Sequence, residues 1–371
     1  MAKAKRKTLP KDFEELLQSA DVSALKSIFD TVDVDARGGV FKQTALAFNS
    51  CPDELSRWLV DRGADLNACD NYGETPLHAR SGHWRGNIAI LLELGADVHH
   101  SAEGRGTPLH RAAAVGNLQV ATMLLEHGAN PDAVNSSGQS PLIFALAQSS
   151  NATIERLAPM AELLLSVMNA PPAKKSLFRR LFGGEIAQSS VITPEMQRRV
   201  ENIGANFEFH RAGYNPNSVD AASDALDHLY RLFEVKPVAR RSMHDGKSNI
   251  TSNGSTWQEQ HHEFWEMLVP STGAAPTVQG EVIRISGRIC DEIERNGGVN
   301  WDADYREMAN ALKGHLESGN SLPAADLDAA SDCVAEITTG KGDPSDLCRL
   351  AVNWVELNPK PVSLGIPSYN R

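Results

Sequence analysis

One four-residue phrase occurs four times in this chain at a nearly constant interval. The copies are Thr44-Ala-Leu-Ala47, Thr75-Pro-Leu-His78, Thr107-Pro-Leu-His110 and Ser140-Pro-Leu-Ile143. Successive intervals of 31, 32 and 33 residues separate their central leucines, Leu46, Leu77, Leu109 and Leu142. A repeat of this size predicts a stack of similar units, because no single unit of that length can bury its own apolar face.

Each of the first three phrases is followed by an apolar run that ends in Gly-Ala. The runs are Trp58–Asp65, Leu91–Asp97 and Leu124–Asn130. Glycine ends a helix because it adopts the left-handed conformation without the steric cost of a Cβ atom. The proline of a phrase suits a first helical turn, and Thr75 or Thr107 before it can cap that helix. Each unit is therefore predicted to contain a turn, a helix, a loop and a second helix.

The Thr-Pro-Leu-His phrase, its period of about 33 residues and the Gly-Ala ending resemble the ankyrin-repeat family over residues 11–235. The resemblance implies helix-turn-helix units with β-turn tips that hold another protein on a concave surface. It also implies that His78 and His110 tie neighbouring turns together. The fold class expected for the whole chain is all-α, an ankyrin-repeat α-solenoid followed by a small helical bundle.

Four segments are expected along the chain. Residues 1–38 hold a degenerate N-terminal capping repeat without the Thr-Pro phrase, and residues 39–170 hold the ankyrin repeats. Residues 171–245 combine an insertion with a degenerate C-terminal helical repeat that caps the stack. Residues 246–371 form a separate C-terminal helical domain.

The third segment contains a basic stretch and two predicted helices. The stretch Lys174–Phe182 lies in the insertion, where residues 172–193 form either a linker packed on the stack, which is favoured, or a contact element for a partner. The phrase Ile203-Gly-Ala-Asn206 predicts another glycine-ended helix. An amphipathic helix is predicted over residues 218–233, with one apolar face made of Ala222, Leu226, Leu229, Tyr230 and Phe233.

The clearest helix of the C-terminal segment is predicted over residues 277–295. Its apolar residues recur every three or four positions, at Val278, Val282, Ile285, Ile289 and Ile293. The opposite face is charged and carries Glu281, Arg284, Arg288, Asp291, Glu292 and Arg295. Their spacing favours ion pairs one turn apart, and the favoured interpretation is that this face is exposed to solvent. The alternative is that these residues meet a partner or tie the bundle together, with Arg288 and Arg295 as bidentate donors.

Two further helices of this segment have clear starting points. Asp302 can cap a helix whose inward residues are Tyr305, Met308, Leu312 and Leu316, and Pro344 can open another that buries Leu347, Leu350 and Trp354. Three stretches are similar to an uncharacterised region of bacterial proteins that sometimes lies beside ankyrin arrays: Trp257 with Trp265–Pro270, Val278–Arg284 and Arg295–Asp302. This resemblance implies a bacterial source and an antitoxin-like, neutralising role.

Composition limits the partners and the compartment. The 36 Lys and Arg against 47 Asp and Glu give a formal net charge of −11, which repels nucleic acid and attracts a cationic partner. The five cysteines are odd in number, widely scattered and without a Cys-x-x-Cys pair, so neither a disulfide framework nor a zinc site is expected. No stretch approaches the ~18 to 20 apolar residues of a membrane span. We expect a cytoplasmic protein.

Motifs of catalysis are absent from the sequence. His261 and His262 are adjacent, so on a helix they point about 100° apart, and no second group of ligands completes a metal site. The sequence has neither a Gly-x-Ser-x-Gly elbow nor a phosphate-binding glycine loop with lysine. We therefore expect no catalytic residue, no cofactor and no metal, and we predict that the chain is not an enzyme.

The family resemblance places the binding residues at the turn tips and beside the first helices. Carried over to this chain, they are Asp70, Asn71, Tyr72, Glu74, Glu103, Arg105, Asn135 and Gln139. The third repeat has a loop two residues longer than the fourth, and this loop carries His83, Trp84 and Arg85. Trp84 either folds back over its neighbour, which is favoured, or is presented to a partner. Tyr72 and Arg105 are the strongest candidates, because aromatic and arginine side chains supply most interface hot spots.

The leading functional hypothesis is a non-enzymatic adaptor or a bacterial immunity-like inhibitor. It would bind a partner protein, such as a basic toxin or effector, through the concave face or the junction with the C-terminal bundle. One alternative is an enzyme whose active site lies in the C-terminal bundle, with Glu281, Arg284, Arg288 and Asp302 in one cleft. Another is a homo-oligomeric scaffold.

Overall fold

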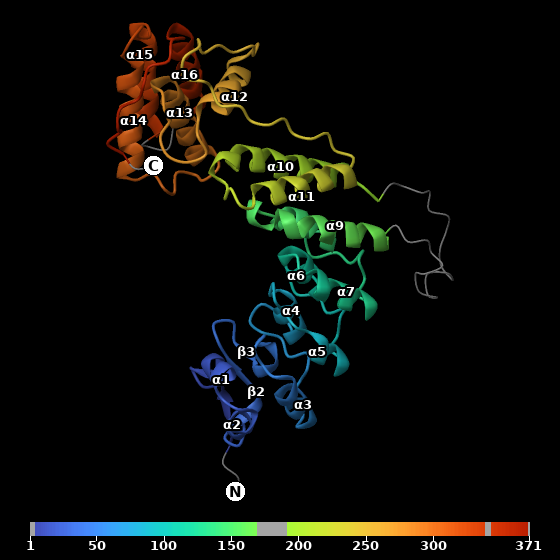
Figure 1. Ribbon diagram of the computed structural model, residues 1–371. Helices are drawn as coiled ribbons and strands as arrows, with labels where there is room; N and C mark the ends of the chain where they lie inside the picture. The colour runs from blue at the N-terminus through green and yellow to red at the C-terminus, as the bar shows by residue number, and fades with distance from the viewer. Residues whose placement is uncertain (1–3, 169–190, 338–342, 370–371) are drawn as a thin grey trace. The chain divides into compact units, whose positions relative to one another are not determined.

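The computed structural model describes residues 4–168, 191–337 and 343–369 (Figure 1). The predicted basic stretch Lys174–Phe182 lies outside the described residues. The described chain forms two compact units. Of the described residues, the first unit comprises 4–168, 191–207 and 215–238, and the second comprises 208–214, 239–337 and 343–369. Within the described ranges, each helix is too short or too polar to cross a lipid bilayer.

The first unit begins with two short helices and a small sheet. The elements are β1 (Arg6–Thr8), α1 (Phe13–Ser19), α2 (Val22–Ile28), β2 (Val32–Gly38) and β3 (Gln43–Thr44). Strand β2 lies between the other two, parallel to β1 and antiparallel to β3. The helices fit a degenerate repeat, but the sheet is an addition to the all-α expectation. Apolar residues alternate with Asp and Arg along β2, which suits a half-buried strand.

Aromatic rings fill the core of this first part. The Phe13 ring meets the Phe29 ring edge-on at 6.1 Å between centroids and the Phe48 ring at 5.6 Å. All three side chains are at most 5% exposed. Edge-to-face ring pairs stabilise a fold beyond the free energy gained by burying the rings, so this cluster stabilises the N-terminal end of the stack.

Four pairs of short helices follow, as the repeated phrase predicts. The pairs are η1 (Ala45–Ala47) with α3 (Asp53–Asp61), α4 (Pro76–Ser81) with α5 (Ala89–Glu93), α6 (Pro108–Val115) with α7 (Leu118–Glu126), and α8 (Pro141–Gln148) with α9 (Ile154–Met168), the last pair linked by η2 (Asn151–Thr153). The copy that lacks both proline and histidine forms only the 3₁₀ turn η1. Gly63, Gly95 and Gly128 have φ values of 89°, 89° and 87°, which confirms the predicted glycine endings.

The two repeat histidines join adjacent units. His78 Nε2 lies 3.0 Å from the carbonyl oxygen of Gly106, and His110 Nε2 lies 3.0 Å from that of Gln139. In each ring Nδ1 accepts from the backbone N–H of the preceding Thr75 or Thr107, so Nε2 carries the proton that is donated to the next turn. The structural role predicted for both residues is confirmed.

Three longer helices end the first unit. They are α9, α10 (Pro194–His210) and α11 (Val219–Leu232), and they run side by side in Figure 1. The apolar face predicted for residues 218–233 is buried throughout, and α11 packs against α9. The prediction of a glycine-ended helix at residues 203–206 is wrong, because α10 continues through Gly204. A Cβ at Gly204 would lie 1.9 Å from the hydroxyl oxygen of Tyr230, so glycine here permits close packing of α10 on α11.

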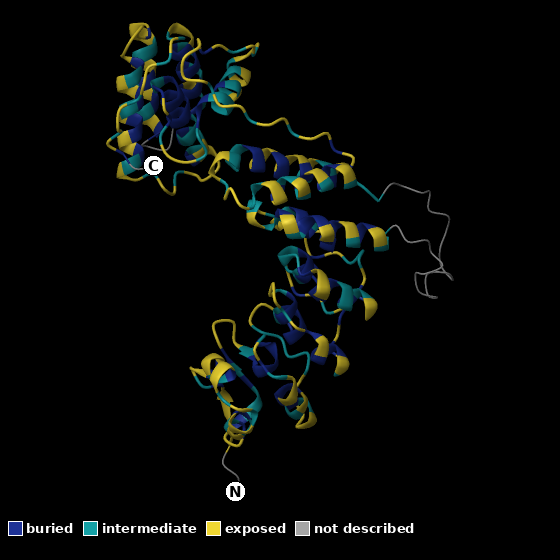
Figure 2. Ribbon diagram, viewed as in Figure 1, coloured by how far each residue is buried: buried dark blue, intermediate teal, exposed yellow. Residues whose placement is uncertain are grey.

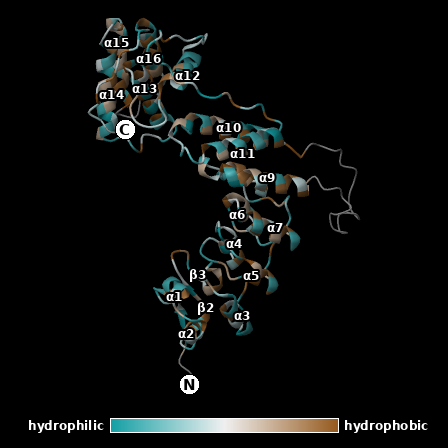
Figure 3. Cartoon of the chain, viewed as in Figure 1, coloured by the Kyte–Doolittle hydropathy of each residue, from teal (hydrophilic) through white to brown (hydrophobic). Residues whose placement is uncertain are grey.

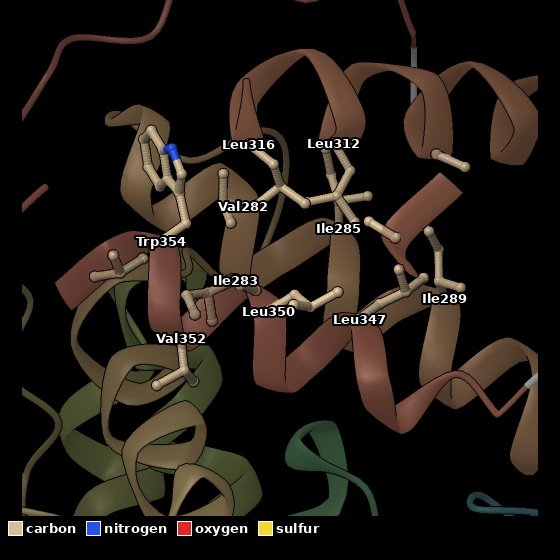
Figure 4. Close-up of a cluster of buried hydrophobic side chains, with 14 of the residues drawn as sticks. Val282, Ile283, Ile285, Ile289, Leu312, Leu316, Leu347, Leu350, Val352 and Trp354 are labelled. Carbon is tan, nitrogen blue, oxygen red and sulfur yellow. The ribbon is translucent and has the colours of Figure 1, made fainter. Parts of the chain in front are cut away.

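In its described residues, the second unit is a bundle of five helices followed by a tail. The helices are α12 (Trp257–Leu268), α13 (Val278–Glu294), α14 (Ala303–Leu316), α15 (Ala324–Ile337) and α16 (Ser345–Leu357), and the short η4 (Arg211–Gly213) also belongs to this unit. Helix α13 packs against α12, α14 and α16. Side chains from α13, α14 and α16 meet in one apolar cluster (Figure 4). Buried residues face the inside of the bundle and exposed ones the outside, and hydropathy follows the same division (Figures 2 and 3).

The charged face of α13 differs from the favoured expectation. Glu281, Arg284 and Glu292 are 0%, 1% and 2% exposed, so half of this face is buried, whereas Asp291 and Arg295 are exposed to solvent as expected. The C-terminal tail covers part of it: Gln279 Nε2 donates to the carbonyl oxygens of residues 358 and 360 at 2.8 and 2.7 Å. The alternative of internal ties is therefore correct for Glu281 and Arg284, with Arg284 as the buried donor. The favoured expectation of solvation holds for Arg295, which forms an exposed pair with Asp291 at 2.9 Å.

Helix starts in this unit agree with the sequence. The Asp302 carboxylate accepts from the backbone N–H groups of Asp304 and Tyr305, which confirms its capping role. The inward residues predicted for α14 and α16 are all buried. These positions were predictable because caps and apolar spacing act within one or two helical turns.

Candidate functional site

Tyr72 and Arg105 lie together on adjacent turn tips. The Arg105 guanidinium carbon is 4.7 Å from the centre of the Tyr72 ring, and the Phe41 ring meets the same tyrosine edge-on at 5.8 Å. Tyr72 is 52% exposed and Phe41 is 47% exposed. Val40, next in the chain, is 88% exposed. The tips therefore present a small apolar surface beside a fixed positive charge.

Glu74 is part of the support of these tips and is not a free groove residue. Its carboxylate lies 2.7 Å from Arg111 Nε and 3.6 Å from an Arg105 nitrogen, and its side chain is 7% exposed. Burial raises the pKa of Glu74, although the two arginines oppose that effect. Arg105 is thus held between the Tyr72 ring and a carboxylate of the neighbouring repeat.

Two other predicted residues shape the tip loops themselves. Asp70 Oδ1 accepts from the backbone N–H groups of Tyr72 and Glu74 at 2.7 and 3.0 Å. Asn135 Oδ1 accepts in the same way from residues 137 and 139, both at 3.0 Å, and Asn135 is only 5% exposed. Asp70 and Asn135 therefore hold the loop conformation, whereas the remaining tip residues Asn71 and Glu103 are exposed and Gln139 is half-buried.

A groove of about 450 Å³ runs from the tips to the first helices. It is lined at one end by Phe41, Asp70 and Arg105, and at the other by Gly82 and His83. A second hollow, of about 580 Å³, shares Gly82 and His83 with it and continues past Trp84 to Arg156 on α9. The repeats therefore present one continuous recessed surface along the first helices of successive units.

The long loop of the third repeat is exposed at its centre. Trp84 is 53% exposed, and the guanidinium carbon of Arg85 lies 4.0 Å from the centre of its ring. Trp84 therefore does not fold back over its neighbour, as the favoured expectation had it, and its ring is exposed to solvent. His83 and Arg85 are exposed on the same loop.

Arg80 supports this loop, a role that was not predicted from the amino-acid sequence. It stands where the fourth repeat has Ala112, and it is 1% exposed. Its Nε donates to the Leu46 carbonyl oxygen at 2.8 Å and its Nη1 to that of Asn87 at 3.4 Å. The signal that could have found it is the replacement of a small residue by arginine inside a repeat phrase. Phe41, Arg111 and Arg156 were also missed, because their roles depend on neighbouring repeats.

The second unit contains a hollow of its own. Its volume is about 570 Å³, and it is lined by His261, His262 and Trp265 of α12, Arg288 and Asp291 of α13, and Tyr305 of α14. His261 Nε2 lies 3.0 Å from the Ser286 hydroxyl oxygen, and burial lowers the pKa of His261 to about 4. Ser286 is fully buried and also donates to the Ile283 carbonyl oxygen at 3.0 Å, so it is not an accessible nucleophile.

The four groups that would mark an active site in this bundle do not share a cleft. Glu281 and Arg284 are buried and paired with each other, Asp302 caps α14, and Arg288 lines the hollow beside His261. Among the residues that the structure describes, no group of three or more His, Cys, Asp or Glu side chains is arranged to hold a metal ion.

Comparison with known protein families finds ankyrin repeats in residues 43–166, which lie within the first unit. A family model described as ankyrin repeats (3 copies) matches residues 84–166. A second model, described as ankyrin repeats (many copies), matches residues 43–81. The C-terminal helical region, including the stretches similar to bacterial proteins, has no family assignment in these comparisons.

Curated relatives are similar over about a quarter of this chain or less. BCL-6 corepressor-like protein 1 of Homo sapiens is 42% identical over 82 residues, which is 22% of this chain and 5% of that protein. Ankyrin repeat and SOCS box protein 16 of Mus musculus is 38% identical over 96 residues, 24% of this chain and 21% of that protein. Putative E3 ubiquitin-protein ligase XBAT35 of Arabidopsis thaliana is 40% identical over 87 residues, 22% and 19% respectively.

The chain thus spans about a fifth or less of the length of these relatives. Their names describe different whole proteins that share a repeat region with this one. The family models match the same part of the chain that forms the helix pairs. Residues 43–166 of this chain are therefore ankyrin repeats, a protein-binding module.

Proposed function

We propose that this chain is a non-enzymatic adaptor or inhibitor that binds a partner protein on the concave surface of its ankyrin repeats. The observation that carries the proposal is the contact between Tyr72 and Arg105, an exposed ring and a guanidinium held 4.7 Å apart on adjacent tips. Exposed aromatic and arginine side chains dominate binding energies at protein interfaces. Here both are already fixed by their neighbours, so little side-chain entropy is lost on binding.

The apolar residues beside this pair strengthen the proposal. Val40 and Phe41 are exposed in the loop before the first repeat phrase, and the backbone N–H of Asn71 donates to the Phe41 carbonyl oxygen at 3.1 Å. That bond joins the loop to the next tip, so the exposed side chains form one surface. Contiguous exposed apolar groups with polar neighbours mark interaction sites.

A neutralising role against a toxin or effector is a narrower form of this proposal. The relatives named above are eukaryotic proteins, and their names do not describe toxins or their inhibitors. The similarity therefore gives no support to a bacterial immunity protein, and an adaptor role is the broader statement. We also place the protein in the cytoplasm, which the odd number and wide scatter of its cysteines support.

The proposal of a non-enzymatic role rests on the structural contacts that the charged groups of the bundle already make. Glu281 and Arg284 neutralise each other in the interior, and Asp302 accepts two backbone N–H groups. Groups committed in this way are poor candidates for proton transfer to a substrate.

Affinity capture from native lysate with full-length protein tests the proposal. The double variant Tyr72→Ala/Arg105→Glu should lose at least about 90% of a specifically captured partner, since the loss of one hot spot costs ~2 kcal/mol or more. A matched control, Val299→Ala/Arg295→Glu, makes a similar change at an exposed apolar residue and an exposed arginine of the bundle. Capture by the control should equal wild type. Equal capture by both variants would show that the tips are not the binding surface.

A further inference from the structure

We propose that the hollow beside Trp84 binds an acidic segment of the partner protein, with an apolar side chain against Trp84 and carboxylates against Arg85 and Arg156. The inference rests on the proposed function, because it names the chemistry of the partner at one part of the same repeat surface. It also differs from the basic target that the net charge of the chain predicts.

The hollow is built from three neighbouring repeats. Gly82 and Trp84 belong to the long loop after α4, Ala114 and Val115 end α6, and Arg156 lies in the first turn of α9. Its floor is therefore small and largely apolar, while an indole and a guanidinium stand at its sides. Its volume of about 580 Å³ is enough for one or two side chains of a bound segment.

The loop that carries Trp84 is fixed by several hydrogen bonds from other repeats. Asn117 Nδ2 donates to the His83 carbonyl oxygen at 3.2 Å, and the Asn87 N–H donates to Asn49 Oδ1 at 3.1 Å. Gly86 makes a close approach possible, since a Cβ there would lie 1.9 Å from the Arg80 carbonyl oxygen. The backbone on both sides of Trp84 is consequently fixed, and the Arg85 guanidinium stacks on the exposed indole ring. An aromatic side chain on a preorganised loop binds with a smaller entropy loss.

Charge at this hollow has the opposite sign to the chain as a whole. Within the described residues, neither Arg85 nor Arg156 has a carboxylate at ion-pair distance, whereas the nearby Arg105 and Arg111 share Glu74. Arg156 lines the hollow, and Arg85 stacks on the ring of Trp84, which also lines it. In a chain of net charge −11, two guanidiniums without a carboxylate partner at this place are a specific local feature. A guanidinium matches the two oxygens of a carboxylate with two parallel hydrogen bonds. Charge complementarity therefore favours Asp or Glu on the bound segment.

A protein segment fits this surface better than a nucleic acid does. Affinity for nucleic acid comes from many phosphate contacts, and two arginines in a chain of net charge −11 supply few. The hollow also continues through Gly82 and His83 into the groove that leads to Phe41. An extended peptide can follow that path from Trp84 towards the tips.

Selection from a displayed library of random short peptides, with full-length protein as bait, tests the inference. Selected peptides should carry more Asp and Glu than Lys and Arg and at least one large apolar residue. Their affinity, measured by fluorescence anisotropy of labelled synthetic copies, should fall by about tenfold or more in Arg85→Glu/Arg156→Glu and in Trp84→Ala. Peptides with Lys in place of Asp and Glu should bind Arg85→Glu/Arg156→Glu better than wild type.

The matched control is Arg62→Glu, which reverses an exposed arginine that stacks on Trp58 at 4.2 Å elsewhere in the repeats. It should leave the affinity unchanged. The inference is overturned if the selected peptides bind Arg85→Glu/Arg156→Glu with the same affinity as wild type. If those peptides no longer bind Tyr72→Ala/Arg105→Glu, the proposed function still stands, although the inference about the hollow does not. A library that yields no binder to wild type contradicts both. A labelled single-stranded oligonucleotide that binds wild type, and is lost in Arg85→Glu/Arg156→Glu, would replace the peptide as occupant.

Discussion

The Tyr369 hydroxyl lies 2.6 Å from Glu281 Oε1, so the C-terminal tail is joined to a carboxylate inside the helical bundle. The same carboxylate accepts from Arg284 at 2.8 and 2.5 Å and from the backbone N–H of Ala275 at 2.8 Å. Burial raises the pKa of Glu281, but the hydrogen bonds from Arg284 and Tyr369 outweigh it and hold the pKa below its ordinary value. The ionised carboxylate is therefore the stable form.

Tyr369→Phe is expected to destabilise the bundle by about 1–3 kcal/mol, because it removes one donor from a buried charged acceptor. Urea denaturation of the full chain, followed by circular dichroism, measures this change. Tyr72→Phe is the control, since Tyr72 is 52% exposed and no hydrogen bond of its hydroxyl is found in the described residues. Equal stability of the two variants would mean that the tail contributes nothing through this bond.

Gly204→Ala is expected to destabilise the first unit, although alanine is the better helix former. Its new Cβ would lie 1.9 Å from the Tyr230 hydroxyl oxygen, and overpacking of this kind costs about 1–3 kcal/mol. Gly314→Ala is the matched change in α14, where a Cβ meets nothing within 4 Å. There the intrinsic gain of about 1 kcal/mol should appear as higher stability. Thermal unfolding of both variants tests whether Gly204→Ala lowers the stability while Gly314→Ala raises it.

Stability is expected to fall as the pH drops below about 6.5. Burial lowers the pKa of His78 to about 4 and that of His261 to about 4. The unfolded chain therefore binds protons between pH 6.5 and 4 that the folded chain does not, and folding loses on the order of 3 kcal/mol per histidine across that window. The stabilisation is complete above pH 6.5 and is lost towards pH 4.

Urea midpoints measured in steps from pH 7 to about 5 check this expectation. His99→Gln, which removes an exposed histidine of the same repeats, is the control variant. A wild-type midpoint that stays constant over this range would contradict the assignment of both rings as neutral, buried groups.

Arg80→Met is expected to loosen the loop that carries Trp84. The change keeps much of the apolar stem but leaves the Leu46 carbonyl oxygen without its donor, at a cost of about 1–3 kcal/mol. Trypsin should then cleave after Arg85 faster than in wild type, which limited proteolysis and mass spectrometry can follow. Arg62→Met, at an exposed position, should change neither stability nor cleavage by a comparable amount. An unchanged cleavage rate in Arg80→Met would show that the loop is held by other contacts.

Local signals in the sequence predicted much of the fold. The Thr-Pro-Leu-His phrases begin helices α4 and α6, the three glycine endings have positive φ, and Asp302 caps α14. Each signal acts within a few residues, so it is visible without knowledge of the neighbours. The period of the phrases also placed Tyr72 and Arg105 on adjacent tips.

Contacts between distant residues decided the features that were not predicted. Gly204 lies within α10, where the absence of a Cβ leaves room for the Tyr230 hydroxyl group. The buried Glu281 carboxylate accepts from Tyr369, 88 residues further on. Glu74 and Asn135 belong to the tips, as expected, but their side chains hold the loops. The exposure of Trp84 likewise depends on hydrogen bonds from other repeats.

Repeat period, caps and glycine endings are encoded within a few residues, so they predict the ankyrin repeats of residues 43–166 and the helices that follow. Which charged residues are buried, which are paired and which remain available to a partner follows from contacts across the fold. Burial and pairing depend on side chains that the fold brings together from far apart in the chain.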